Sequence, residues 1–293
     1  MKPASFDYLA PTSLEEALAL LADNPDAKLI AGGQSFVPVM NFRLASPPLL
    51  IDLNRIPSLA YINSDSTGLR IGAMTRNRAL ETSDVVRSAN PLLSAAMPWI
   101  AHVAIRNRGT MGGSLSNADP AAELPAIAMV CDAEFTLDRR TGARTVKATD
   151  FFQGLFSTAL APDEILTRIR FPAWPANRRH GFFEVSRRHG DFAIVGAAVT
   201  LDLDANGRVA AARIGVFGAA DTPVLVPDAA AALIGKSSTE TTEFAREAGR
   251  IARARITPRA DHQASSDYRA ELIETLVRRA LEQALGHAHR KAA

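Results

Sequence analysis

Apolar positions recur at two different spacings along the chain, and the spacings separate helical from extended segments. Apolar side chains recur at helical spacing at Leu14, Leu18 and Leu21. The residue just before them is Ser13, and Glu16 follows it three positions later, which is the spacing of a capping box. This pattern predicts an amphipathic helix that starts after the serine and ends near the next proline.

Short apolar runs without helical spacing predict strands elsewhere in the first half. Residues 27–31, 49–53 and 69–73 are such runs, and the first leads directly into a pair of glycines. Residues 77–81 have the composition of a helix start. Helix and strand therefore alternate through this half of the chain.

The pattern continues with two predicted helices and then a series of strands. Residues 91–100 and 120–130 are predicted to be helical, and a glycine-rich turn at 109–114 lies between them. Pro120 would stand at the start of the second helix. The section 134–171 is rich in strand-forming residues and closes the first half.

A composition change marks a predicted domain boundary. The segment 171–179 contains two prolines among polar and basic residues, as expected where few contacts cross between domains. It divides the chain into a domain at 1–174 and a second domain at 178–285.

The second domain begins with a predicted hairpin. Residues 193–203 and 209–217 are apolar strand candidates on either side of an Asn-Gly turn. The last helix is predicted at 268–285, with an apolar stripe that packs on the sheet.

Charge and cysteine content exclude several classes of protein. The 33 Lys and Arg residues nearly balance 31 Asp and Glu residues, so no broad basic surface for nucleic acid or an anionic membrane is expected, and a phosphate-bearing ligand needs a local site. Cys131 is the only cysteine, and one thiol cannot form an intrachain disulfide, a zinc finger or a cysteine-ligated iron–sulfur cluster. The start of the chain lacks a signal-peptide pattern, and no apolar run reaches the roughly 20 residues of a membrane span. A cytoplasmic protein is expected.

The first candidate binding segment follows a predicted strand and consists of Gly32, Gly33, Gln34 and Ser35. Their consecutive N–H groups could surround a phosphate, with the serine hydroxyl as a further donor. The same residues also fit a tight turn without any ligand, and both interpretations stay open.

A second segment, residues 109–114, is longer and more specific. Its three glycines and two hydroxyls offer donors to an anion. Asp119 and Glu123 follow about one helical turn apart, and their carboxylates could accept hydrogen bonds from sugar hydroxyls. Donors for phosphate beside acceptors for hydroxyls are typical of a site for a nucleotide-like cofactor.

Other catalytic motifs are missing from the sequence. No G-x-G-x-x-G follows a strand, and residues 235–237 fail as a P-loop because Ala230 stands where the first glycine is required. There is no G-x-S-x-G elbow, and Cys131 lies in an apolar run typical of a buried, inert thiol. His102 is either a partly buried structural residue or a cofactor contact.

In this order and separation, the two segments resemble the FAD-binding subunit of the molybdenum hydroxylases, the family of the carbon monoxide dehydrogenase medium subunit and the xanthine dehydrogenase flavin domain. The resemblance covers nearly the whole chain. It rests on residues 31–35, 71–75, 105–114, 118–123 and 190–193.

The resemblance implies a vanillyl-alcohol-oxidase-type (PCMH-type) FAD-binding domain made of two α+β subdomains, at about 1–55 and 56–174. A C-terminal domain with a three-stranded antiparallel sheet and helices would follow. FAD would lie between the subdomains, with its pyrophosphate held by residues 32–35 and 110–114. Polar contacts along the cofactor would come from Asp119 and Glu123.

The family positions that match this sequence give a set of expected cofactor contacts. They are Ile30, Ala31, Gly32, Gly33, Gln34, Ser35, Phe36, Thr75, His102, Ile105, Arg106, Gly109, Thr110, Gly112, Gly113, Ser114, Ala118, Asp119, Glu123 and Phe192. Phe192 would cover one side of the flavin ring, where relatives often carry tyrosine. The sequence departs from the family pattern at Gln34, where many relatives have histidine, and at Glu184, where many have lysine, which would reverse a charge near the entrance for the electron acceptor.

The function implied is that of an electron-transfer oxidoreductase subunit without catalytic or metal-binding residues of its own. A large partner subunit would hydroxylate substrate at a molybdenum cofactor, and two [2Fe-2S] clusters on a small subunit would pass electrons to FAD here and then to an external acceptor. A dimer of such heterotrimers is expected. Substrate and acceptor stay open. The alternatives are a self-contained FAD-dependent oxidoreductase and a non-enzymatic nucleotide-binding module.

Overall fold

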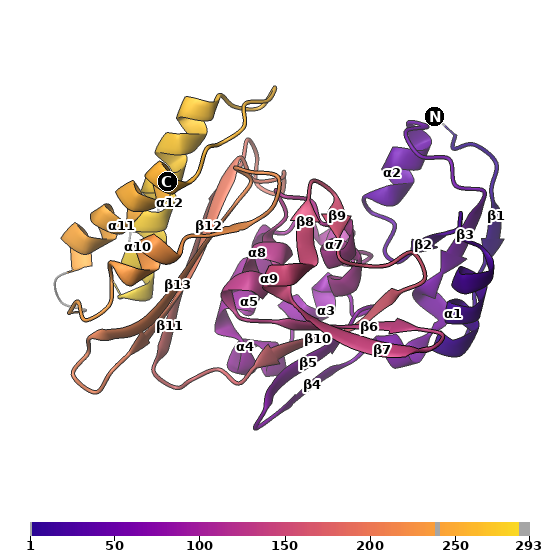
Figure 1. Ribbon diagram of the computed structural model, residues 1–293, viewed down its shortest axis with the longest axis horizontal. Coiled ribbons are helices and arrows are strands. Elements are labelled where there is room, and N and C mark those ends of the chain that lie inside the picture. The colour runs from indigo at the N-terminus through magenta and orange to yellow at the C-terminus, as the bar shows by residue number, and fades with distance from the viewer. Residues whose placement is uncertain (1, 238–240, 287–293) are drawn as a thin grey trace.

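The computed structural model describes residues 2–237 and 241–286, which form three bodies in a row (Figure 1). We call them the N-terminal subdomain (residues 2–55), the middle subdomain (56–172) and the C-terminal domain (178–286). Each contains its own sheet, and three clusters of buried apolar residues lie in and between them.

A three-stranded parallel sheet in the order β1-β3-β2 organises the N-terminal subdomain. Ser13 caps α1 by accepting the N–H of Glu16 at 3.1 Å, and Ala17, Leu18 and Leu21 of that helix are buried, so the predicted amphipathic helix is confirmed. The elements are β1 (Asp7–Leu9), α1 (Leu14–Asp23), β2 (Lys28–Ile30), α2 (Phe36–Asn41), β3 (Leu49–Asp52) and the 3-10 turn η1 (Leu53–Arg55).

The middle subdomain is built on a five-stranded antiparallel sheet in the order β4-β5-β10-β6-β7. Helices α4 and α7 contact this sheet, and α5 and α8 add buried residues to the same apolar cluster. Its elements are η2 (Pro57–Leu59), β4 (Ile62–Asp65), β5 (Gly68–Gly72), α3 (Asn77–Glu81), α4 (Asp84–Ala89), α5 (Pro91–Ala96), η3 (Met97–Trp99), α6 (Val103–Arg106), α7 (Met111–Asn117), α8 (Glu123–Val130), β6 (Glu134–Arg139), β7 (Gly142–Lys147), α9 (Ala148–Phe151), β8 (Phe152–Gly154), β9 (Ser157–Thr158) and β10 (Ile165–Pro172).

The C-terminal domain has an antiparallel sheet in the order β11-β12-β13-β14. The predicted hairpin joins β12 to β13, and Gly207 in its turn has φ +72°, a conformation that favours glycine. The expected three-stranded sheet is present as three long strands, and the two-residue β14 extends it. The elements are β11 (Arg178–Val185), β12 (Val195–Leu203), β13 (Val209–Phe217), β14 (Val224–Leu225), α10 (Pro227–Ala231), α11 (Thr241–Arg255) and α12 (Ser266–Ala284).

Two local predictions in the middle subdomain are wrong. The glycine-rich segment expected to be a turn is largely helical, because the Thr110 side chain caps α7 and Gly112 and Gly113 lie in its first turn. The following helix begins at Glu123 and not at Pro120. The Asp119 carboxylate accepts a hydrogen bond from the N–H of Ala121 at 2.9 Å. Because this bond holds the chain in a local turn, the helix begins three residues after Pro120.

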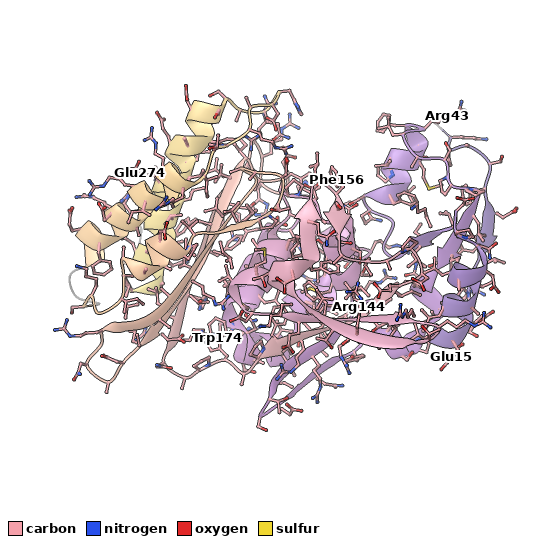
Figure 2. All side chains as sticks on the ribbon, viewed as in Figure 1. Glu15, Arg43, Arg144, Phe156, Trp174 and Glu274 are labelled. Carbon is pink, nitrogen blue, oxygen red and sulfur yellow. The ribbon has the colours of Figure 1, made fainter. Side chains whose placement is uncertain are left out.

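The C-terminal sheet lies between two groups of helices. One face is covered by α12, and the other packs on α5 and α8 of the middle subdomain. The rings of Phe182 and Trp99 are 6.0 Å apart across this junction. Trp174, labelled in Figure 2, lies in the connection between β10 and β11, and the Arg178 guanidinium is 5.4 Å from its ring centre. No helix among the described residues is long and apolar enough to cross a membrane.

Candidate cofactor-binding site

A cavity of about 480 Å³ lies where the three bodies meet. Its wall is formed by residues 28–36 of the N-terminal subdomain, the start and end of α7, residues 160–166 before and in β10, and residues 190–192 of the C-terminal domain. The cavity therefore depends on segments that are far apart in the sequence and that the fold brings together.

We call the loop Gly32–Ser35 the amide loop, after its backbone N–H groups. Within the described part of the chain, the N–H groups of these four residues have no hydrogen-bond acceptor. Gly33 has φ +70°, a conformation that favours glycine, and all four residues line the cavity. Such a row of free amides is the kind of arrangement that binds an anion.

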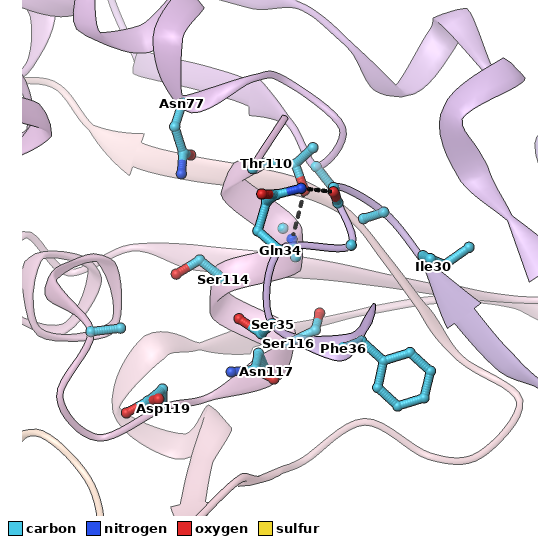
Figure 3. Close-up of a pocket in the computed structure, with 18 of the residues that line it drawn as sticks. Ile30, Gln34, Ser35, Phe36, Asn77, Thr110, Ser114, Ser116, Asn117 and Asp119 are labelled. Atoms are coloured by element: carbon cyan, nitrogen blue, oxygen red, sulfur yellow. Dashed lines mark hydrogen bonds between the residues drawn. The ribbon is translucent and has the colours of Figure 1, made fainter. Parts of the chain in front are cut away.

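Side chains from neighbouring loops fix the position of the amide loop. Asn54 Nδ2 donates to the Ala31 carbonyl at 2.8 Å, and Arg76 Nη2 donates to Asn54 Oδ1 at 2.7 Å. Arg76 also donates to the Arg108 carbonyl. Gln34 Nε2 donates to the Gly32 carbonyl at 2.9 Å, drawn as a dashed line in Figure 3. The loop is thus held before any ligand arrives.

The start of α7 differs from the amide loop, because its N–H groups are already used. The amides of Met111 and Gly112 donate to backbone carbonyls of residues 75 and 73, at 3.0 and 2.8 Å. The amide of Gly113 donates to Thr110 Oγ1 at 3.1 Å, and that of the next residue donates to the Thr110 carbonyl at 3.1 Å. The amides of Met111 to Ser114 are therefore already used within the protein, and the donors that this segment leaves for a ligand are its hydroxyls and the Thr110 N–H, which has no acceptor among the described residues.

Two glycines, one in the amide loop and one in α7, are required because other parts of the protein pack closely against them. A Cβ at Gly32 would overlap the Arg108 carbonyl oxygen, and a Cβ at Gly112 would lie 2.5 Å from the Ala73 Cβ. These contacts hold the amide loop, the 105–109 segment and α7 against one another. The glycines therefore shape the cavity by close backbone approach.

Two carboxyl groups lie at the end of the cavity beyond α7. Asp119 lines the cavity, and burial raises the pKa of its carboxyl group. Glu123 is 5% exposed, and burial, opposed by its own backbone N–H and reinforced by the charge of Asp119, raises its pKa to about 7. Both can accept hydrogen bonds from ligand hydroxyls when ionised.

Asn77 supplies a further polar group at the cavity. Its Oδ1 atom is buried and has no hydrogen-bond partner among residues 2–237 and 241–286. Buried polar atoms are nearly always paired, so an unpaired amide oxygen at a cavity indicates a missing donor. Free amides, hydroxyls and this acceptor together fit a ligand that carries phosphates, hydroxyls and ring nitrogens.

Sixteen of the twenty predicted residues line the cavity. They are Ile30, Ala31, Gly32, Gly33, Gln34, Ser35, Phe36, Ile105, Gly109, Thr110, Gly112, Gly113, Ser114, Asp119, Glu123 and Phe192. Figure 3 shows several of them around the cavity, from both the N-terminal and the middle subdomain.

Four predicted contacts do not line the cavity, and each has another place in the fold. Arg106 is buried and forms an ion pair with Glu81, with Nε 2.8 Å from the carboxylate. Thr75 donates its hydroxyl to a backbone carbonyl at 2.9 Å. Ala118 ends α7 with φ +48°. His102 packs its ring against Gly190 and supports the loop before Phe192.

Several cavity residues were not predicted. They are Lys28, Leu29, Leu53, Ala73, Met74, Asn77, Ile100, Ala101, Ser116, Asn117, Ala122, Leu160, Glu164, Ile165, Leu166, Gly190 and Asp191. Ser116 and Asn117 could have been found, because they continue the polar stretch after Ser114. Leu160 and the start of β10 carry no local signal, because only the tertiary fold brings them to the cavity.

Glu184 differs from the lysine that many relatives carry, and it was expected to lie near the entrance for the electron acceptor. It is 6% exposed and does not line the cavity, whereas an entrance residue would be open to solvent. The expected charge reversal at an entrance is therefore wrong, because β11 turns this side chain into the junction with the middle subdomain. Phe192 does line the cavity and is half exposed at 50%.

Comparison with known families identifies the class to which this fold and cavity belong. Residues 4–174 match the family described as the FAD binding domain in molybdopterin dehydrogenase. Residues 180–284 match the CO dehydrogenase flavoprotein C-terminal domain. Both halves of the chain thus have the fold of an FAD-binding oxidoreductase subunit.

Individual relatives agree over nearly their whole length. The chain is 43% identical to the 6-hydroxypseudooxynicotine dehydrogenase complex subunit alpha of Paenarthrobacter nicotinovorans, covering 98% of this chain and 97% of that one. It is 36% identical to the carbon monoxide dehydrogenase medium chain of Afipia carboxidovorans, covering 98% and 99%. A solved structure of carbon monoxide dehydrogenase from Hydrogenophaga pseudoflava, which lacks the Mo-pyranopterin moiety, matches with a TM-score of 0.94 and 38% identity, covering 99% and 100%. The chain belongs to the FAD-binding medium subunits of the molybdenum hydroxylases, and the family and fold expected from the resemblance are confirmed.

Proposed function

We propose that this chain binds FAD in the cavity with the pyrophosphate on the amide loop. The observation that carries the proposal is the row of four N–H groups, Gly32 to Ser35, that lack acceptors within the described residues and belong to residues lining the cavity. An anion there would receive several hydrogen bonds at no cost in loop rearrangement, because Asn54 and Arg76 already hold the loop.

The remaining polar groups would distribute along the cofactor. Hydroxyls of Ser35, Ser114 and Ser116 can donate to phosphate oxygens, and Asp119 and Glu123 can accept from sugar or ribityl hydroxyls. Phe192 would shield one face of the flavin ring, since a phenyl ring excludes water but offers no hydrogen bond. When bound, FAD supplies the two-electron chemistry that the side chains of this protein lack.

The chain works as one subunit of a larger enzyme in this proposal. Cys131 is buried, and burial raises the pKa of its thiol to about 12, so the thiol is neutral and unsuited to ligate iron. Iron–sulfur clusters would therefore lie on a small partner subunit and the molybdenum cofactor on a large one. Electrons would leave through this subunit to an external acceptor. A dimer of heterotrimers in the cytoplasm is the assembly we propose.

Purification of the native assembly tests this function. We expect the chain to copurify with two partner chains that contain molybdenum and iron, and the flavin absorbance to correspond to one FAD per copy of this chain. Isolation of this chain alone from cells, without flavin and without metal-containing partners, would contradict the proposal.

A further inference from the structure

Residues 186–193 lie between β11 and β12 and form a loop that reaches the cavity, which we call the Phe192 loop. Among the described residues, the C-terminal domain lines the cavity only through residues 190–192 of this loop. The N–H of Ile194 donates to the Val185 carbonyl at 2.7 Å and closes the base of the loop. Within the described chain, no hydrogen bond joins the loop to the middle subdomain. Other contacts must therefore keep it at the cavity.

Two ring contacts attach the Phe192 loop to the middle subdomain. The His189 ring lies 5.9 Å from the Trp99 ring, centre to centre. Gly190 lies against the ring of His102, so closely that a Cβ on Gly190 would come within 2.6 Å of His102 Cε1. Gly190 also has φ +91°, so glycine allows both the close approach and the turn of the loop. Neither Trp99 nor His102 lines the cavity.

Phe192 has no apolar cluster of its own to hold it. Its side chain is 50% exposed, and it does not belong to the three clusters of buried apolar residues or to the residues packed against them in the described chain. A half-exposed phenyl ring gains little from burial. The place of this ring at the cavity wall therefore depends on where the backbone of the loop lies.

Trp99 and His102 belong to one turn, residues 98–102, and Arg106 holds that turn in place. Arg106 is buried, and its Nη1 donates to the last two backbone carbonyls before His102, at 2.8 and 2.6 Å. Its Nε donates to a carboxylate of α3 at 2.8 Å. Ala101 has φ +46°, which is unfavourable for alanine and persists only with support from its surroundings. The arginine thus fixes the two rings that the Phe192 loop contacts.

We propose that the Phe192 loop is a separately attached cover of the cavity, and that the rings of Trp99 and His102 set how far it closes. Both are positioning residues, since they act through the loop and do not line the cavity. A loop attached by ring contacts opens more easily than the strands on either side of it. Opening would expose the cavity on the side of the C-terminal domain. Control of access to a bound flavin rests on the function proposed above, whereas the attachment of the loop does not.

Tryptic cleavage of the native assembly measures loop opening without any flavin, because Arg187 and Arg188 lie exposed within the loop. His102→Ala removes the ring beneath Gly190, and His102 is itself exposed, so the variant should fold. Cleavage at the two arginines should become about fivefold faster, since cleavage follows the population of the open loop. His102→Phe keeps a flat ring and should be cleaved at the wild-type rate. Equal acceleration in both variants would contradict support by the ring.

Two controls separate release of the Phe192 loop from general loosening. Cleavage after Arg140, an exposed residue between β6 and β7, should keep its wild-type rate in every variant. His262→Ala removes another exposed histidine, which does not line the cavity, and should change neither rate. Equal cleavage of the loop in wild type and His102→Ala, including none in either, would overturn the proposal. Equal acceleration at Arg140 would overturn it as well.

Iodide quenching of flavin fluorescence in the same variants tests whether the loop controls access. His102→Ala should raise the quenching constant about threefold, because a displaced loop leaves the bound ligand open to solutes. His102→Phe and His262→Ala should keep the wild-type value. Faster cleavage of His102→Ala with an unchanged quenching constant would show that the loop is no cover and would overturn the proposal. If the wild type binds no flavin but shows the expected cleavage pattern, the proposed function fails and the attachment of the loop stands.

Discussion

The amide loop and the start of α7 look alike in sequence but differ in what they can offer a ligand. Each contains two adjacent glycines followed closely by a serine. In the amide loop the N–H groups have no acceptors within the described chain, while at α7 the first four are bonded to Thr110 and to residues 73 and 75. A glycine-rich sequence therefore does not by itself define an anion site, because the decisive property is whether its amides are already satisfied.

The strongest test of this difference is Gly33→Val. A β-branched residue is strongly disfavoured at φ +70°, so the loop must rearrange and its amides lose their alignment. Loss of two hydrogen bonds to a charged group corresponds to about 3 kcal/mol or more, so we expect FAD affinity to fall at least a hundredfold. Flavin absorbance per protein and a binding titration would measure the change.

Gly235→Val provides the matched control for the same strain. Gly235 has φ +77°, no atom lies within 4 Å of where its Cβ would be, and it does not line the cavity. This variant should lose some stability and keep its flavin. If both variants lose flavin equally, general destabilisation rather than the amide loop explains the result.

The two segments also differ in their dependence on pH. The amide loop contains no titratable side chain, whereas the end beyond α7 contains Glu123, whose pKa burial raises from 4.5 to about 7. The folded state keeps this proton over a range where the unfolded chain has lost it. The stability linked to Glu123 is therefore complete below about pH 4.5 and falls as the pH rises through 7, by on the order of 3 kcal/mol.

Denaturant titrations across this pH range would measure that loss. Glu123→Gln should flatten the curve between about pH 4.5 and 7, because the variant carries no titratable group at this position. A variant whose stability falls as steeply as that of wild type would show that Glu123 does not hold the proton.

Thr110→Ala should have a smaller effect. It removes the side chain that caps α7 through the Gly113 N–H, and loss of such a cap costs about 1 kcal/mol. We expect a stability loss of that size and a decrease in FAD affinity of no more than about tenfold. Thr110→Ser should restore both, which thermal unfolding and flavin titration would show.

Ser114→Ala should have the smallest effect. At most one neutral hydroxyl donor is lost, which corresponds to about 0.5–1.5 kcal/mol. FAD affinity should therefore fall only severalfold. A loss as large as that of Gly33→Val would show that α7 and not the amide loop dominates anion binding.

Much of the fold could be predicted because its signals are local. The Ser13 cap and the spacing of Leu14, Leu18 and Leu21 are sufficient for α1, and the Asn-Gly turn is sufficient for the β12–β13 hairpin. The start of α7 was missed because glycine is a poor helix former, and the helix depends on capping by Thr110 and on packing against Ala73.

The candidate site was predictable only where it coincides with sequence motifs. The amide loop, Asp119 and Glu123 lie in such segments and line the cavity. Asn77 and Leu160 reach it only through the tertiary fold. The burial of Glu184 could not be foreseen either, because it depends on the alternation of β11 and on the packing of that strand against α5.

Determination of the structure of the native assembly with its flavin would test the central claim most directly. We expect the FAD pyrophosphate oxygens to accept hydrogen bonds from the N–H groups of Gly32 to Ser35, and the amides at the start of α7 to keep their bonds to Thr110 and to residues 73 and 75. Density for the pyrophosphate on the α7 amides, with the amide loop empty, would contradict it.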